Sequence, residues 1–448
     1  MAMRGLVSYW SVVASCLAVA SVCNGAECHG KPNPNAKPNN NPIDVSEPVF
    51  VKSVPNGKLF TVGSGEDMFH VVHVYGDPYH MGYAHGQLMG STAKNFMDDV
   101  WQYMEDQIEQ AINQTVPYFH DWFLKDVANF GLDAALDAEI LATDAFSGSY
   151  FAEEMKGLAA GCGSEFKKIQ RIHMIGELTK GDCSMFGAWG RATASTNGGL
   201  LQLRALDWNV DGPFKNYPQV TVYHPPADGS LGHAFANIGW TGWVGSITGF
   251  SSVDMAMSEI GVTYPDDTFG KDSRFGVPFT YIIRDILQFD KTLEHAMQRI
   301  NGSRRTCSLL LGIGDGKINQ FRGVEYSASV ANFFTDTNLE PTATWHPRIN
   351  DTVYWGMDWL CPGYSQVLAE RLQTFHGKLT SEVTIHQILP VVQTGDLHVA
   401  VYDLAKREVY VANARGGQET GPQYAYDRTF VRLDMETLFS EKAPTTSI

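Results

Sequence analysis

Basic residues are scarce in this sequence. Its 448 residues include 33 Lys and Arg against 49 Asp and Glu, which leaves a formal net charge of −16 at pH 7. A chain of that sign is repelled by phosphate backbones and by anionic lipid surfaces. Charged residues make up only 18% of the chain, whereas apolar residues make up 44% and aromatic residues 12%. A nucleic-acid role is therefore not expected, and a folded globular protein is.

Long apolar runs are also missing, apart from one at the start. After Arg4, residues 6–22 are mostly apolar, and Ala18-Val19-Ala20 and Cys23-Asn24-Gly25 are competing cleavage sites. This pattern predicts a secretory signal peptide over residues 1–26, with an uncleaved membrane anchor as the alternative. The run is short for a bilayer span, and no later stretch offers about 18 continuous apolar residues. We therefore expect no stable membrane insertion of the mature protein.

Three glycosylation sequons fit a secretory route. They are Asn-x-Ser/Thr triplets at Asn113, Asn301 and Asn350, each a weak signal by itself. Together with the signal peptide they predict a secreted or lysosomal glycoprotein.

Cysteines are few. The chain has seven, and cleavage near Ala26 would retain Cys28, Cys162, Cys183, Cys307 and Cys361. Thiols usually pair in an oxidising compartment, so this odd number leaves one over, which can be structural, intermolecular or catalytic. Cleavage after Ala20 would also retain Cys23 and make the number even.

Helical and strand-like patterns follow one another in blocks. Residues 27–48 are rich in Pro and Asn with almost no apolar content, which predicts a flexible leader. Strand-like alternation begins near Val49, and helical spacing of apolar residues fills 81–112 and 120–180. From Cys183 onward the patterns predict strands at 200–204, 219–223, 244–247, 255–257, 308–313, 397–402 and 408–411, and a helix at 278–300. This order favours an α+β domain with helix-covered sheets.

Several common catalytic motifs are absent. The sequence has no Gly-x-Ser-x-Gly elbow, no phosphate-binding loop and no His-Glu-x-x-His motif. His70 and His73 lie in an expected strand, where positions three apart face opposite ways. We therefore expect neither a metal nor a cofactor. Cys162 lacks the neighbours of a papain-like nucleophile and is expected in a disulfide.

The most informative segment surrounds Cys183. This cysteine opens an expected strand, and a second strand after a glycine turn ends in Arg204-x-x-Asp207. A hairpin would bring the arginine and the aspartate back to the cysteine. A nearby positive charge favours the thiolate, which is the reactive form. A buried salt bridge beside an inert cysteine would explain the same spacing.

A family resemblance favours the catalytic interpretation. Residues 75–88 resemble the opening signature of the acid ceramidase-like and acyltransferase-type N-terminal-nucleophile (Ntn) hydrolases. Further segments follow in that family's order: 156–162, 182–184, 203–208, 276–279 with Arg284, and 364–365 with Arg371. The resemblance implies a four-layer αββα sandwich and self-cleavage between Asp182 and Cys183. The products would be a mainly helical α-subunit segment, residues 49–182, and a β-subunit segment, residues 183–448, held as one domain.

The resemblance also implies roles for individual residues. Cys183 would be the nucleophile, with its freed α-amine as general base, and Arg204 and Asp207 would orient the nucleophile and the amine. Relatives carry asparagines for the oxyanion or leaving group where this chain has Met257-Ser258-Glu259 and residues 355–359. Ser258 and backbone N–H groups are therefore expected as substitutes. Asp358 and Arg371 are expected to contact the substrate.

The expected activity is hydrolysis of the amide bond in an N-acylated lipid such as a ceramide, by an α/β heterodimer. An N-acyl amino-acid or peptide amidase, or an acyltransferase, of the same fold is the first alternative. A non-catalytic lipid-binding glycoprotein is the second. Of three possible pairings of the remaining cysteines, Cys28–Cys162 and Cys307–Cys361 is the expected one.

Overall fold

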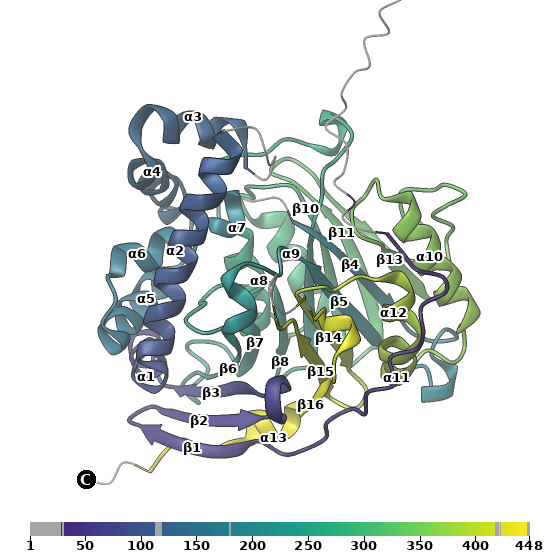
Figure 1. Cartoon of the computed structure of the whole chain (residues 1–448), viewed down its shortest axis with the longest axis horizontal. Helices are drawn as coiled ribbons and strands as arrows, with labels where there is room; N and C mark the ends of the chain where they lie inside the picture. The colour runs from purple at the N-terminus through teal and green to yellow at the C-terminus, as the bar shows by residue number, and fades with distance from the viewer. Residues whose placement is uncertain are drawn as a thin grey trace, which may run out of the picture.

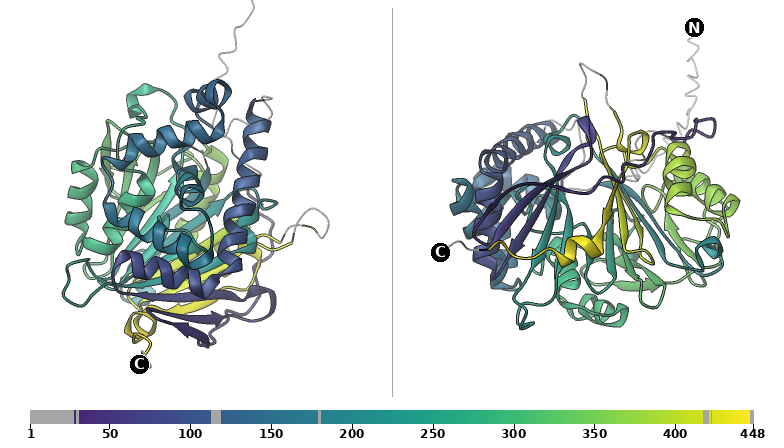
Figure 2. Two further views of the ribbon diagram at one scale, coloured as in Figure 1. Left: turned by 90° about the vertical axis from the view of Figure 1, so that its left-hand side faces the viewer. Right: turned by 90° about the horizontal axis from the view of Figure 1, so that it is seen from below.

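Two stacked β-sheets lie between layers of helices in the computed structural model of the chain (Figure 1), and the view from below in Figure 2 shows helices on both outer sides of the sheets. The structure describes residues 28, 31–112, 119–178, 181–416, 421 and 423–445. The expected signal peptide and the sequon at Asn113 lie outside these residues. The predicted αββα sandwich is confirmed.

The larger sheet has ten strands and is antiparallel except where β3 pairs with β6. Its first three strands come from the expected α-subunit segment and the others from the expected β-subunit segment, so the two segments share one sheet. In spatial order the strands are β1 (Val49–Val54), β2 (Gly57–Val62), β3 (Phe69–Tyr75), β6 (Pro218–His224), β7 (Phe235–Trp240), β8 (Thr248–Ser251), β9 (Met255–Gly261), β10 (Leu309–Asp315), β11 (Gln320–Tyr326) and β12 (Ala331–Phe334).

The smaller sheet has six antiparallel strands. They are, in spatial order, β13 (Thr352–Trp355), β4 (Asp182–Ala188), β5 (Leu201–Asp207), β14 (His398–Asp403), β15 (Glu408–Asn413) and β16 (Val431–Asp434). Strands β4 and β5 pack face to face with β9 of the larger sheet. All seven residues of β4 and of β5 are buried, so any polar side chain on them needs a partner inside the protein.

Helices cover the outer face of each sheet. The larger sheet is covered by helices α1 (Pro78–Met89), α2 (Ser91–Ile112), α5 (Ser149–Cys162), α8 (Phe279–Phe289) and α9 (Leu293–Gly302), with α3 (Asp121–Phe130), α4 (Leu132–Asp144), α6 (Phe166–Ile172) and α7 (Ile175–Leu178) beside them. The smaller sheet is covered by α10 (Pro362–Thr374), α11 (Ser381–Val383) and α12 (Leu389–Val392), and α13 (Met435–Ser440) follows β16.

Two segments of the family resemblance pack directly against each other as α1 and α5. A side-chain carbon on Gly82 of α1 would collide with the backbone of Glu154, and one on Gly157 of α5 would collide with the backbone of Tyr79. The two helix backbones can approach this closely only because both positions are glycine. The glycines in these segments therefore serve helix packing.

Three element predictions are wrong in their bounds. The expected helix 81–112 is two helices, because Gly90 adopts a positive φ of 47° between α1 and α2. The expected helix 278–300 is also interrupted, because Asp290 is extended and α8 ends there. Residues 244–247 form an irregular, bent loop rather than a strand.

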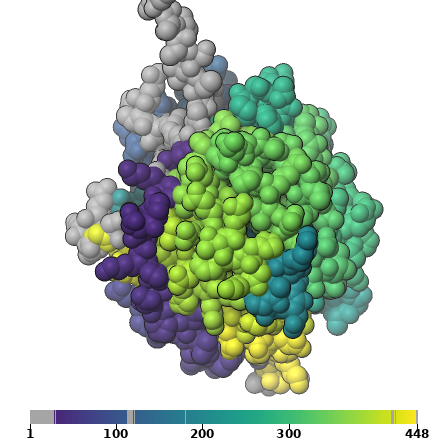
Figure 3. Space-filling view, turned by 90° about the vertical axis from the view of Figure 1, so that its right-hand side faces the viewer, coloured from purple at the N-terminus to yellow at the C-terminus, as the bar shows by residue number. Residues whose placement is uncertain are grey.

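The expected flexible leader is wrong over residues 31–48, which pack on the protein. Figure 3 shows this purple segment lying along the light-green surface of the C-terminal half. The side-chain amide of Asn39 donates to the carbonyl oxygens of Tyr426 and Arg428 at 3.1 and 2.9 Å. Asp44 forms a parallel β-bridge with Val431. Hydrogen bonds from asparagine side chains and from the backbone hold the segment in place, although it has almost no apolar side chains to bury.

Candidate functional site

Cys183 lies on β4 inside the sandwich, beside a buried arginine. The guanidinium nitrogen Nη2 of Arg204, on the neighbouring strand β5, donates to its sulfur at 3.6 Å. The same nitrogen donates to Oε2 of Glu259 at 3.1 Å, and Nε donates to the Glu259 carbonyl oxygen at 3.0 Å. The hairpin predicted from the sequence forms, since Cys183 pairs with Leu206 and Asp182 with Asp207. The structure brings together a thiol, a cation and a carboxylate.

These charges act on the thiol in opposite directions. Burial raises the pKa of Cys183 above its ordinary value, the guanidinium of Arg204 opposes this, and the carboxylates of Glu259 and Asp207 add to it. The cysteine is only 1% exposed. In the intact chain Cys183 is therefore a protonated thiol, and the charge of Arg204 is what favours its ionisation to the thiolate.

Asp207 is held by the turn before β14. Its Oδ2 accepts a hydrogen bond from the Thr394 hydroxyl at 2.5 Å, and its Oδ1 accepts from the backbone nitrogens of Gly395 and Asp396 at 2.8 and 3.1 Å. The Asp207 carboxylate accepts no hydrogen bond from the amide N–H of Cys183. That N–H donates to the carbonyl oxygen of Met357 at 3.1 Å. The expected contact between Asp207 and the α-amine is thus absent while residues 182 and 183 remain joined.

Met357 holds the amide that the family resemblance identifies as the cleavage point. Its backbone nitrogen donates to the Ser184 hydroxyl oxygen at 2.8 Å while its carbonyl accepts from Cys183. It does so with a φ of 71°, a conformation that costs energy in residues other than glycine and clusters at functional positions. The hydroxyl oxygens of Ser184 and Thr394 lie 2.6 Å apart, and Ser184 donates in this pair because the Thr394 proton goes to Asp207. The turn before β14 and the segment after β13 therefore both fix this end of β4.

A second carboxyl lies beside Asp207. Asp396 accepts the backbone N–H of Trp208 at 2.8 Å, and its own backbone N–H contacts Asp207. Burial raises the pKa of both carboxyls, and the charge of Asp207 raises that of Asp396 further. Three hydrogen bonds favour the ionised form of Asp207, so the proton of this pair belongs to Asp396.

A cavity of about 450 Å³ opens onto Cys183, Arg204 and Glu259. Its inner wall is mostly apolar and aromatic, and its other end carries charged groups. The wall comprises Ile175, Leu206, Trp208, Phe214, Trp240, Trp243, Ile247, Phe279, Leu309 and Leu397, and the charged end comprises Asp266, Asp267, Lys271 and Asp272 with His120. A cavity of this size and lining can hold a ligand with an apolar and a polar part.

Two buried histidines, His85 on α1 and His173 after α6, hold the aromatic part of this wall. His85 Nε2 accepts the backbone N–H of Gly242 at 3.0 Å, and His173 Nε2 accepts that of Val244 at 2.8 Å. The His173 ring stacks on Trp243 with centroids 5.0 Å apart. Burial lowers the pKa of both imidazoles to about 4, which keeps them neutral and able to accept these bonds.

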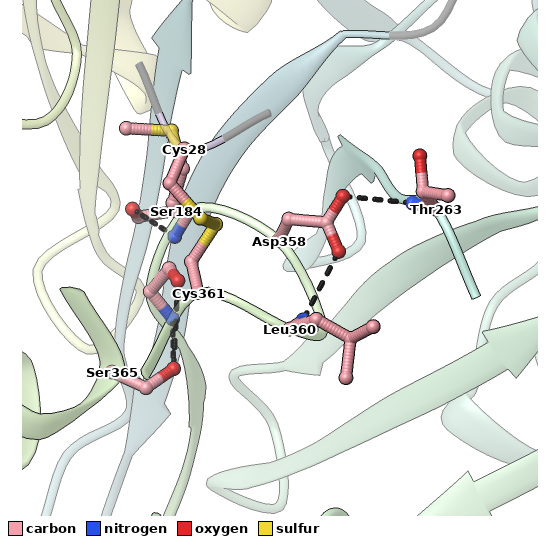
Figure 4. Close-up of a disulfide and its surroundings, with 9 residues drawn as sticks. Cys28, Ser184, Thr263, Asp358, Leu360, Cys361 and Ser365 are labelled. Atoms are coloured by element: carbon pink, nitrogen blue, oxygen red, sulfur yellow. Dashed lines mark hydrogen bonds between the residues drawn. A yellow bond between two sulfur atoms is a disulfide. The ribbon is translucent and has the colours of Figure 1, made fainter. Parts of the chain in front are cut away.

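The other residues predicted for the site lie behind it. The Ser258 hydroxyl is fully buried and accepts a hydrogen bond from Gln202 at 2.7 Å. Asp358 is also buried, and its carboxylate accepts the backbone N–H groups of Thr263 and Leu360 at 2.8 and 3.2 Å (Figure 4). None of Ser258, Asp358 and Arg371 is among the residues that line the cavity. Their contact with substrate stays a prediction, and in this structure Asp358 fixes the wall loop at Thr263.

The expected disulfides are wrong as well. Cys28 is bonded to Cys361, at the start of α10 (Figure 4). Cys162 and Cys307 are free. The packing of residues 31–48 along the C-terminal half brings Cys28 to this place, 333 residues away in sequence. Of the sequons within the described residues, Asn301 and Asn350 are both exposed.

Sequence reasoning missed three residues of the site. Glu259 was identified only as a replacement for an expected asparagine, yet it pairs with Arg204 and lines the cavity. No sequence motif marked Met357 or Thr394 as a site residue. Met357 merely precedes Asp358, and Thr394 merely lies in the turn before β14. Among the described residues there is no group of three His, Cys, Asp or Glu side chains placed to hold a metal, and no helix long and apolar enough to cross a bilayer.

The fold is an αββα sandwich in which a buried cysteine lies near the start of an interior strand of the smaller sheet, with an arginine and an aspartate on the next strand. The chain belongs to the family of the proteins dcd1A and dcd1B of Dictyostelium discoideum. It is 34% identical to dcd1A over 451 residues, which cover 96% of this chain and 98% of dcd1A. It is 34% identical to dcd1B over 416 residues, which cover 90% and 81%.

Solved structures of low identity are also similar. A Caenorhabditis elegans N-acylethanolamine-hydrolyzing acid amidase ortholog matches with a TM-score of 0.37 and 14% identity, over 50% of this chain and 93% of that chain. Penicillin V acylase from Agrobacterium tumefaciens matches with a TM-score of 0.36 and 12% identity, over 56% and 94%. No protein-family model matches the sequence.

Proposed function

We propose that this protein is a self-processing cysteine amidase. The observation that carries the proposal is the contact between Cys183 and Arg204 at the inner end of the cavity, at the point where the β-subunit segment would begin. A cysteine that becomes the first residue of a chain has its own α-amine as a general base, so the site needs no catalytic histidine.

Cleavage and turnover use the same sulfur. In the precursor, Cys183 Sγ bonds to the carbonyl carbon of Asp182, the bond from that carbon to the Cys183 nitrogen breaks, and the nitrogen takes the thiol proton. Water then opens the thioester, which releases the Asp182 carboxylate and restores the thiol. In turnover the freed α-amine accepts the thiol proton, and the sulfur bonds to the substrate carbonyl carbon. The amine part of the substrate leaves with that proton, and water then hydrolyses the thioester to release the acid and restore the thiol.

The surrounding residues have matching tasks in this scheme. The guanidinium of Arg204 stabilises the thiolate of Cys183, and the carboxylate of Glu259 holds that guanidinium in place. Met357 holds the Cys183 nitrogen before cleavage, and Asp207, fixed by the turn at residues 394–396, would hold the resulting ammonium afterwards. Donors for the tetrahedral oxyanion would be backbone N–H groups at the cavity, since Ser258 is turned toward Gln202.

For the substrate we propose an N-acylated amphiphile of the ceramide class. The apolar inner wall suits an acyl chain, and the charged end suits a polar head group. The exposed sequons at Asn301 and Asn350 and the signal-like start of the chain support a secreted or lysosomal glycoprotein that works as an α/β heterodimer.

A substrate panel tests this proposal. Purified protein is incubated with N-acyl lipids and with N-acyl amino acids at acidic and neutral pH, beside the Cys183→Ala variant as the matched control. Hydrolysis of the lipids by the parent protein alone is expected. Cleavage of only the water-soluble acyl amino acids would transfer the assignment to a small-substrate amidase or acyltransferase. An intact chain without turnover that still binds the lipids would identify a lipid-binding glycoprotein.

A further inference from the structure

Gly181, two residues before Cys183, lines the cavity in the intact chain, where it lies between the ring of Trp208 and the backbone of β9 at Gly261. A side-chain carbon on Gly181 would lie 2.9 Å from Cζ3 of Trp208. One on Gly261 would collide with the carbonyl oxygen of Gly181 and lie 2.8 Å from its nitrogen. The space between Trp208 and Gly261 is therefore one glycine backbone thick.

The surroundings favour departure of this segment once the chain is cut. Asp182 is buried and pairs in register with Asp207, which itself contacts Asp396. All three carboxyls lie close enough to the hydroxyl of Tyr364 to raise its pKa, in addition to the larger effect of burial. Cleavage adds a new carboxylate at Asp182 to this acidic environment. Burial of several negative charges together is costly, so the cut end is driven toward solvent.

The vacated space lies on the acyl side of the reacting carbonyl. In self-cleavage the sulfur attacks the carbonyl of Asp182, and Gly181 belongs to the acyl group of that amide. In turnover the same sulfur attacks the substrate carbonyl from the same position. The acyl group of the substrate must then extend where Gly181 lay, between Trp208 and Gly261.

We propose that Trp208 and Gly261 form an acyl-chain slot that Gly181 fills before cleavage, and that the slot selects acyl groups unbranched at the fifth carbon. That carbon corresponds to the α-carbon of Gly181 when the carbonyl carbon of Asp182 is counted as the first. This inference deepens the proposed amidase function and rests on it. An unbranched methylene chain is as slim as the glycine backbone that the slot holds, whereas a methyl branch would meet either the indole ring or the β9 backbone.

The test compares two fluorogenic amides of the same amine, one octanoyl and one 5-methyloctanoyl, whose branch corresponds to a side-chain carbon on Gly181. The mature parent enzyme should prefer the unbranched amide by at least about tenfold in kcat/KM, and Trp208→Ala should reduce that preference to about twofold or less. Trp240→Ala is the matched control. It removes another indole of the same cavity that lies outside 4 Å of the Gly181 position, so it should leave the preference unchanged.

Gly261→Ala gives a readout that needs no substrate. The added methyl group collides with Gly181, so self-cleavage should slow at least about tenfold, measured by the appearance of a chain that begins at Cys183. Self-cleavage of Gly261→Ala at the parent rate, or an active Trp208→Ala enzyme with the parent preference, would overturn the slot. Failure of the parent enzyme to hydrolyse either amide would instead overturn the amidase function.

Discussion

The guanidinium nitrogen Nη2 of Arg204 lies 3.6 Å from the sulfur of Cys183. Both residues are fully buried on adjacent strands of the smaller sheet, and the same nitrogen also pairs with Glu259 of the larger sheet. The nucleophile therefore lies at a junction between the two sheets, where each sheet supplies one of the charges that act on it.

Removal of the sulfur should stop both reactions of the proposed mechanism. In Cys183→Ala we expect no self-cleavage and no amide hydrolysis, because no other atom of the site can perform either step. In Cys183→Ser both should be slower, on the order of 100-fold or more, because a hydroxyl is a weaker nucleophile than a thiol. N-terminal sequencing and amide turnover give the two measurements. An intact parent chain that hydrolyses its substrate would contradict the prediction.

Neutralisation of Glu259 should make Cys183 more acidic. In Glu259→Gln the side chain can still accept the Arg204 hydrogen bond, but its negative charge no longer raises the pKa of the thiol. The pH dependence of alkylation by iodoacetamide should move about one pH unit lower. Cys162 and Cys307 are replaced by serine in both proteins so that alkylation reports Cys183. A shift to higher pH would show that the carboxylate acts mainly by orienting Arg204.

The disulfide should hold the two chains together after cleavage, because Cys28 belongs to the first chain and Cys361 to the second. Denaturing electrophoresis should show one band without reductant and two bands with it. In Cys28→Ser two bands should appear under both conditions, whereas Cys162→Ser should behave as the parent protein because Cys162 is free. Two bands from the parent protein without reductant would rule out the pairing.

Stability should fall as pH rises through neutrality, in part because of Glu177. This buried carboxyl accepts hydrogen bonds from the backbone nitrogen of Phe279 and the hydroxyl of Thr306, and burial raises its pKa to about 7 from an ordinary value of 4.5. The folded state then holds a proton that the unfolded state releases. The resulting stability is complete below about pH 4.5 and is lost as pH rises to about 7, by about 3 kcal/mol.

Urea unfolding at pH 5 and pH 8 measures this effect. The loss of unfolding free energy between the two pH values should be smaller in Glu177→Gln than in the parent protein. Glu153→Gln, which removes an exposed carboxylate paired with Lys156, is the control and should leave the loss unchanged. An equal loss in Glu177→Gln and the parent protein would assign the proton to another group.

Contacts between neighbours in sequence were predictable. Cys183, Arg204 and Asp207 lie on two strands that follow each other in the chain, so strand pairing alone brings them to one place. The same holds for the strands after residue 183 and for most helices, whose apolar spacing reflects which face is buried. Errors at these elements lie at their ends, as at Gly90 and Asp290, where one backbone conformation interrupts a continuous pattern.

The sequence by itself determined the residue types, the strand and helix periods, and the hairpin that carries the candidate nucleophile. Only the tertiary structure decided that Glu259 faces Arg204 across the sheets, that Met357 and Thr394 hold the end of β4, and that Cys28 reaches Cys361. The physical reason is that local periods record which face of an element is buried but not which distant residue lies opposite. That partner is selected by the packing of both sheets, by the path of residues 31–48, and by the need of every buried polar group for a hydrogen bond.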